Sequence, residues 1–171
     1  MGEMTPERQA LVEALAEALR ARDLRVVSAE SCTGGLIAAA CTSVAGSSRW
    51  FERGFVTYSN EAKTDLLGVP AALIAMHGAV SEAVARAMAE GALRHAKAQL
   101  SVAVTGIAGP DGAVEGKPVG TVWVAVSQRD GHGDATAPAT RATLLQLNGD
   151  RAAVRHQTVT RALEALLGSL A

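Results

Sequence analysis

The side chains in this sequence that are best suited to catalysis, as a base or a nucleophile, are Lys63, Ser31 and Cys32. Lys63 is one of three lysines among 16 basic residues, and it lies in the first turn of a predicted helix that Asn60 would cap. A cation there opposes the helix dipole by about 0.3–1 kcal/mol, which lowers a lysine pKa only slightly. To act as a base near neutral pH, Lys63 must therefore also be buried; the alternative is an ordinary solvated lysine.

Ser31 and Cys32 are candidate nucleophiles, because an alcohol or a thiol attacks an acyl carbon once a base takes its proton. Cys32 would need a paired histidine, and the four histidines form no recognisable pairing with it, so we expect it to be small buried filler. The alternative role for Ser31 is to cap the following helix. Tyr58, the only tyrosine, lies five positions before Lys63, where it could face the same site or pack among neighbouring aromatic rings.

Two glycine-rich turns follow apolar runs that are typical of buried strands. Residues 31–35 follow the run at 24–29, and residues 105–112 follow the run at 100–104. Ligands of open α/β sheets bind at the carboxyl ends of strands, and a turn that begins a helix offers N–H groups to a phosphate or an oxyanion. Either turn alone could equally do no more than redirect the chain. Neither matches a dinucleotide-binding or P-loop motif.

The elements that must position these residues alternate between helix and strand. Gly91, inside one predicted helix, suggests a close approach between two backbones. Predicted helices cover residues 6–22, 36–42, 60–67, a stretch ending at 77, 82–97 and a last stretch after 150. Predicted strands cover residues 24–29, 51–59, 100–104, 119–127 and 135–147, with a hairpin turn at 129–133. This order predicts one α/β domain over residues 1–171, its sheet covered on both faces and carrying an antiparallel hairpin at one edge.

Composition and charge narrow the class of protein. Of the 171 residues, 49% are hydrophobic and 19% are charged, and 16 basic against 17 acidic side chains give a net charge of −1. Nucleic-acid binding needs a basic surface, so we expect no nucleic-acid partner. No apolar run approaches the roughly 20 residues of a membrane-spanning helix, and the histidine and cysteine spacings do not fit a zinc site. We expect a cytoplasmic protein with no metal and no membrane partner.

Four segments in register give the sequence a specific resemblance. They are AESCTGG at 29–35, VTYSNEAK at 56–63, TGIAGP at 105–110 and KPVGTV at 117–122. Together they resemble the CinA C-terminal domain family, which includes stand-alone nicotinamide-nucleotide amidohydrolases. The match runs nearly end to end, as far as GDR at 149–151 before the last helix.

The resemblance implies a three-layer α/β/α sandwich with a mostly parallel sheet. It also implies hydrolysis of nicotinamide mononucleotide to nicotinate mononucleotide and ammonia, with no cofactor. The implied mechanism passes through an acyl-enzyme, with Ser31 as nucleophile, Lys63 as base and Tyr58 relaying the proton or holding Lys63. Backbone N–H groups at 33–35 would receive the oxyanion, while Ser48, Arg151 and the turn at 105–109 would hold the 5′-phosphate. The expected substrate-binding residues are Thr33, Gly34, Gly35, Ser48, Asn60, Thr105, Gly106, Ala108, Gly109 and Arg151.

Two alternatives use the same sequence without catalysis. One is a nucleotide-binding or regulatory domain that keeps the pocket, and the other is a structural domain in which Ser31 caps a helix and Lys63 is solvated. Ammonia release from nicotinamide mononucleotide separates the amidohydrolase from both alternatives. The expected partner is a small-molecule pyridine nucleotide, and because alanine-rich helix faces permit close packing, we expect a homodimer.

Overall fold

Side-chain caps determine where most of the helices begin in the computed structural model, which describes residues 4–129 and 137–171. Each capping oxygen accepts a hydrogen bond from the N–H three residues further along the chain. The capped helices are α1 (Pro6–Ala21), α3 (Asn60–Leu67), α5 (Glu82–Arg94) and α6 (Arg151–Ser169), with caps at Thr5, Ser59, Ser81 and Asp150. Neither α2 (Leu36–Thr42) nor α4 (Ala71–His77) has a side-chain cap of this kind.

The strands form one mixed sheet in the order β2-β1-β3-β4-β5. Their bounds are β1 (Val26–Glu30), β2 (Phe51–Val56), β3 (Leu100–Gly106), β4 (Thr121–Gln128) and β5 (Ala139–Gln146). β1 pairs in parallel with β2 and β3, whereas β4 runs antiparallel to both β3 and β5. All strands except β4 therefore point the same way, and the antiparallel β4–β5 pair forms one edge, as the sequence predicts.

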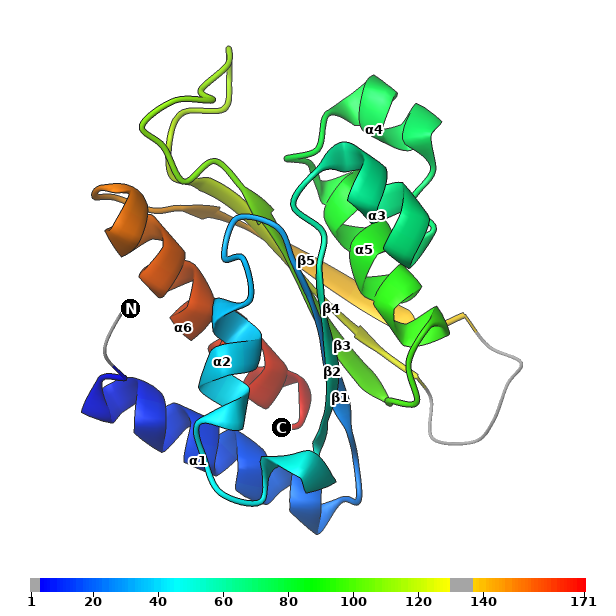
Figure 1. Ribbon diagram of the computed structural model, residues 1–171, viewed down its shortest axis with the longest axis vertical. Helices are drawn as coiled ribbons and strands as arrows, with labels where there is room; N and C mark the ends of the chain where they lie inside the picture. The colour runs from blue at the N-terminus through cyan, green and yellow to red at the C-terminus, as the bar shows by residue number, and fades with distance from the viewer. Residues whose placement is uncertain (1–3, 130–136) are drawn as a thin grey trace.

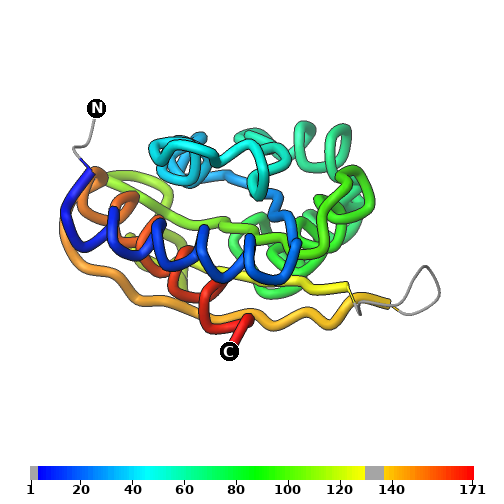
Figure 2. The backbone as a smooth tube through the Cα atoms, turned by 90° about the horizontal axis from the view of Figure 1, so that it is seen from below, coloured from blue at the N-terminus to red at the C-terminus, as the bar shows by residue number. Residues whose placement is uncertain are grey.

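Helices cover both faces of the sheet, giving three layers (Figure 1). Helices α1, α2 and α6 lie on one face, with α1 packed against α6 (Figure 2), and α3, α4 and α5 lie on the other. Each face has its own core. The first is built around Leu15, Leu19, Trp50, Leu163 and Leu166, and the second around Leu67, Met88, Ala89 and Leu93. The predicted α/β/α sandwich is confirmed.

Several predicted boundaries are wrong by one to three residues. Ser59, not Asn60, caps α3, because its hydroxyl accepts the hydrogen bond of the Ala62 N–H at 3.0 Å. α5 ends at Arg94 rather than at 97, and β2 ends at Val56 rather than at 59. Apart from its first residue, the hairpin turn predicted at 129–133 lies outside the described residues.

The glycine at position 91 sets how closely α3 can approach α5. A Cβ atom there would lie 2.1 Å from the carbonyl oxygen of Leu67, the last residue of α3, so only glycine fits without a shift of the backbone. This close approach confirms the prediction for Gly91. In the ranges 4–129 and 137–171, no helix combines the length and the apolar character needed to cross a bilayer.

Candidate active site

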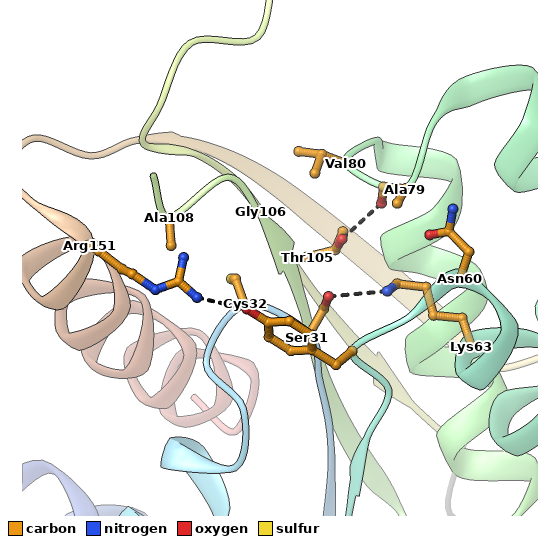
Figure 3. A pocket seen from close by; sticks show the side chains of 11 residues that line it. Ser31, Cys32, Asn60, Lys63, Ala79, Val80, Thr105, Gly106, Ala108 and Arg151 are labelled. Atoms are coloured by element: carbon orange, nitrogen blue, oxygen red, sulfur yellow. Dashed lines mark hydrogen bonds between the residues drawn. The ribbon is translucent and has the colours of Figure 1, made fainter. Parts of the chain in front are cut away.

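A cavity of about 240 Å³ opens where the carboxyl ends of β1 and β3 face the first residue of α6 (Figure 3). Both glycine-rich turns border it, as the sequence predicts from the position of each turn after a strand. Its walls also include the connection from β2 to α3 and the segment between α4 and α5. The lining residues are Ser31, Cys32, Tyr58, Asn60, Lys63, Ala79, Val80, Thr105, Gly106, Ala108 and Arg151.

Ser31 and Lys63 are in direct contact in this cavity (Figure 3). Lys63 Nζ lies 3.1 Å from Ser31 Oγ, and it donates hydrogen bonds to the backbone carbonyls of Thr57 at 2.9 Å and Ser59 at 3.4 Å. A neutral amine has two N–H bonds and one lone pair. Because the two carbonyls can accept both N–H bonds, the lone pair is left to face the hydroxyl proton of Ser31.

The environment of Lys63 favours its neutral form. The side chain is only 1% exposed, and among the described residues no carboxylate forms an ion pair with it. Burial lowers the pKa of Lys63, and the negative charge of Glu61 offsets that effect only in part. Burial is the condition that the sequence alone left open, because a position at a helix start does not by itself depress a lysine pKa far enough.

Cys32 lies beside Ser31 but is a poor nucleophile. Burial raises the pKa of its thiol to about 11, so at neutral pH the sulfur keeps its proton. No histidine in the described residues is hydrogen-bonded to it. Its 5% exposure fits the small buried residue that the sequence predicts.

Glu30, which sequence reasoning missed, is the last residue of β1, and its carboxylate lies at the start of α2. Its fully buried carboxylate accepts hydrogen bonds from three backbone N–H groups and two hydroxyls, at 2.7 to 3.2 Å. The donors are the N–H groups of Gly35, Ile37 and Ala38 and the hydroxyls of Ser28 and Thr33. The chain thus supplies its own anion to this helix terminus, where negative charge is favoured.

Two of the three N–H groups at 33–35, which the resemblance assigns to the oxyanion, are already bound within the turn. The Gly35 N–H donates to Glu30, and the Gly34 N–H donates to the carbonyl of Ser31 at 3.1 Å. The Thr33 hydroxyl is also bound to Glu30, and none of the three residues lines the cavity. The N–H groups of Gly34 and Gly35 and the hydroxyl of Thr33 therefore organise the turn, whereas the Thr33 N–H has no acceptor among the described residues.

Arg155 is a second functional candidate that the sequence analysis did not single out. From the second turn of α6, its Nε donates to the carbonyl of Cys32 and its Nη2 to the carbonyl of Thr33, both at 3.1 Å. The signal in the sequence was the spacing of Arg151 and Arg155, four residues apart at a helix start. Arg151, in the first turn, opposes the helix dipole, and at this spacing the two cations face one side of the helix.

The side chains of Arg151 and Tyr58 meet across the cavity. Arg151 Nη2 donates to the Tyr58 hydroxyl at 2.7 Å, and Nη1 donates to the carbonyl of Gly109 at 2.8 Å. The hydroxyl of Tyr58 therefore bonds to Arg151, while Lys63 is held by the carbonyls of the residues on either side of Tyr58. The ring is 58% exposed, so it is not part of a buried aromatic cluster.

The other predicted binding residues divide into two groups. Asn60, Thr105, Gly106 and Ala108 line the cavity, and the hydroxyl of Thr105 donates to the carbonyl of Ala79, fixing the segment between α4 and α5. Ser48 does not line it, because it lies in the short 3-10 helix Ser47–Arg49 that precedes β2. At about 3.3 Å per residue, β2 separates Ser48 from the cavity by roughly 20 Å. Within a single chain, Ser48 therefore lies apart from this cavity, and its role in binding stays a prediction.

The fold and the site together define a three-layer α/β protein with a buried serine–lysine contact at the carboxyl ends of its strands. The chain belongs to the CinA C-terminal domain family, whose model matches residues 8–170. This finding confirms the resemblance that the four sequence segments indicate.

Relatives match over nearly the whole chain. A protein of Escherichia coli K12, named nicotinamide-nucleotide amidohydrolase PncC, is 52% identical over 160 residues, which cover 94% of this chain and 93% of that protein. A putative competence-damage inducible protein of Symbiobacterium thermophilum is 53% identical over 158 residues, but this chain spans only 37% of its length. The crystal structure of competence/damage inducible protein CihA from Agrobacterium tumefaciens superposes with a TM-score of 0.91, at 41% identity and 98% coverage of both chains.

Proposed function

We propose that this protein is a nicotinamide-nucleotide amidohydrolase that converts nicotinamide mononucleotide to nicotinate mononucleotide and ammonia, a reaction of pyridine nucleotide recycling. The observation that carries the proposal is the 3.1 Å contact between Lys63 Nζ and Ser31 Oγ in a buried cavity. The 52% identity to PncC of E. coli over 94% of the chain supports the choice of substrate.

The first half of the reaction forms an acyl-enzyme. Neutral Lys63 takes the hydroxyl proton of Ser31, and Oγ attacks the carboxamide carbon, whose oxygen becomes an oxyanion. The carbon–nitrogen bond then breaks, and the departing nitrogen takes the proton from Lys63 and leaves as ammonia. The nicotinoyl group stays on Ser31 as an ester.

The second half uses the same base to hydrolyse this ester. Lys63 takes a proton from a water molecule, and the resulting hydroxide attacks the ester carbon. When the bond to Oγ breaks, Ser31 regains its proton from Lys63 and nicotinate mononucleotide is released. The cycle returns Lys63 to its neutral form, so the balance of protons is complete without any further group.

The charges around the cavity support an anionic nucleotide as substrate. Arg151 lines the cavity and points its guanidinium into it, between Tyr58 and the carbonyl of Gly109 (Figure 3). We assign the 5′-phosphate to Arg151, because a guanidinium binds phosphate in a bidentate manner. With the carboxamide at Ser31, the ribose would lie near Thr105 and Ala108.

The experiment that tests the proposal measures ammonia release from nicotinamide mononucleotide. Ser31→Ala should abolish turnover, whereas its free energy of unfolding should fall by only about 1–3 kcal/mol, because one buried hydrogen bond, between the hydroxyl and Lys63, is lost. Cys32→Ala is the matched control, because it alters the neighbouring side chain in the same cavity and should retain activity. If Cys32→Ala loses activity and Ser31→Ala keeps it, the nucleophile is misassigned.

A further inference from the structure

We propose that Arg155 is a positioning residue for the amide N–H that stabilises the oxyanion. It would act through the backbone of the turn at 31–34 rather than by touching the substrate. This inference rests on the proposed function, because an oxyanion forms only if Ser31 attacks a carboxamide.

Few backbone N–H groups near Ser31 are free to donate a hydrogen bond to the oxyanion. The N–H of Ser31 itself donates to the carbonyl of Val104 at 3.0 Å, and those of Gly34 and Gly35 are also bound. Within the described part of the chain, the N–H groups of Cys32 and Thr33 have no hydrogen-bond acceptor. Because Cys32 follows Ser31 and lines the cavity, its N–H is the donor closest in sequence to the attacking oxygen.

A chain of hydrogen bonds connects Arg155 to this N–H. Arg155 donates to the carbonyl of Thr33, which shares a peptide unit with the N–H of Gly34. That N–H donates to the carbonyl of Ser31, which shares a peptide unit with the N–H of Cys32. In a trans peptide the C=O and the N–H point in opposite directions, so each bond fixes the direction of the next donor.

The same series of hydrogen bonds both orients the N–H of Cys32 and makes it a stronger donor. A cation bound to a carbonyl polarises that peptide, and polarisation passes along successive hydrogen bonds. The second bond of Arg155, to the carbonyl of Cys32, does the same for the free N–H of Thr33. Both N–H groups therefore become better donors to a negative oxygen.

The electrostatic surroundings favour a functional explanation for this arginine. Arg155 lies in the second turn of α6, just past its positive N-terminal end, so the helix dipole gives no support to a cation there. Burial, together with the charges of Arg8 and Arg155, lowers the pKa of His156, and Arg8 adds a second positive charge to this part of α6. No ion pair in the described residues involves Arg155. A purely structural contact at this place would be better made by a neutral donor.

The test compares Arg155→Met with the matched control Arg8→Met. Arg8 is also half-buried and also makes two hydrogen bonds, but to Thr160 and to the carbonyl of His156, away from the cavity. For Arg155→Met we expect kcat to fall roughly 10²-fold, with KM within about threefold of the unaltered protein. Arg8→Met should keep kcat within about threefold, and Arg155→Lys should recover part of the loss because its amine can bind one of the two carbonyls.

A second measurement separates this role from general support of the fold. A nucleotide bearing 3-formylpyridine carries an aldehyde that a serine can convert to a tetrahedral adduct, whereas the product nicotinate mononucleotide stays planar. Arg155→Met should bind the aldehyde at least about tenfold more weakly and the product unchanged. Equal weakening of both ligands, or an unchanged kcat, would overturn the inference. Absence of activity in the unaltered protein would instead refute the proposed function.

Discussion

At the scale of single residues, burial gives Lys63 its chemistry. An amine on the surface is protonated at neutral pH and cannot accept a proton, but the same amine when buried loses much of the solvation that stabilises its charge. Two carbonyls then fix its direction, since Thr57 and Ser59 bind it from either side of Tyr58. The local backbone of one short connection therefore orients the base.

The lowered pKa of Lys63 predicts the pH dependence of the reaction. The base must be neutral, so kcat/KM should rise with pH through one ionisation that lies below 10.5, the ordinary lysine value. Initial rates of ammonia release across the pH range measure this profile. Lys63→Arg should be inactive throughout, because a guanidinium keeps its proton. A rise centred at or above 10.5 would mean that Lys63 is solvated.

The contact between Tyr58 and Arg151 predicts what Tyr58→Phe does. If the hydroxyl acts mainly by holding Arg151, its loss should raise KM for nicotinamide mononucleotide about threefold to tenfold and leave kcat within about threefold. Steady-state kinetics with the mononucleotide and with the riboside, which has no phosphate, provide the comparison. If turnover instead slows by roughly two orders of magnitude with both substrates, the result supports the proton relay that the resemblance implies.

Ser31, Lys63 and Arg151 could be predicted from the sequence because their residue types and the family motifs single them out. Glu30 could not, because its role depends on which N–H groups converge on it after the strand and α2 are packed together. Arg155 was equally hidden, since its partners are carbonyls more than 120 residues away in the chain. Main-chain acceptors leave no trace in a sequence pattern.

At the scale of elements, the packing of α3 on α5 determines where the base stands. Lys63 is on α3, and α3 ends at Leu67, whose carbonyl lies against the backbone of α5 at Gly91. The position of the amine relative to β1 therefore depends on a contact at the other end of its own helix. Packing at this contact is a condition for the geometry of the site.

Gly91→Ala should destabilise the protein by about 2 kcal/mol or more, because the added Cβ overlaps the carbonyl of Leu67. Chemical denaturation measures the free energy of unfolding, and kcat should fall as well because α3 is displaced. Gly168→Ala in α6 is the matched control, since a Cβ there meets nothing within 4 Å. It should stabilise the protein by about 0.5–1 kcal/mol. Similar effects of both substitutions would contradict the packing argument.

The elements themselves follow well from capping residues and apolar runs. The predicted cap of α3 is wrong because two neighbouring residues, Ser59 and Asn60, can both cap a helix, and Ser59 is the one that does so. The place of Ser48 could not be predicted either, because the sequence does not show whether the strand after it runs parallel or antiparallel to its neighbours. The direction of β2, set by its parallel pairing with β1, decides that question.

At the scale of the whole molecule, binding of the substrate should stabilise the fold. In the Ser31→Ala variant, nicotinamide mononucleotide at 100 times its Kd should add about 2.7 kcal/mol to the free energy of unfolding. The shift in thermal midpoint with and without nucleotide measures this effect, and nicotinamide alone should give less because it cannot reach Arg151. No shift with the mononucleotide would mean that this cavity does not hold it. The homodimer expected from the alanine-rich helix faces stays a prediction.

The carboxylate of Glu30 has one more consequence, which concerns how a substrate can be oriented. Because an internal anion already neutralises the start of α2, the attraction left for a phosphate is concentrated at Arg151 and the adjoining end of α6. A nucleotide in the cavity therefore meets an asymmetric field that is most positive at the wall formed by Arg151. We expect this field to favour the orientation that places the phosphate at Arg151 and the carboxamide at Ser31, because the reversed nucleotide would lose the attraction of Arg151 for its phosphate.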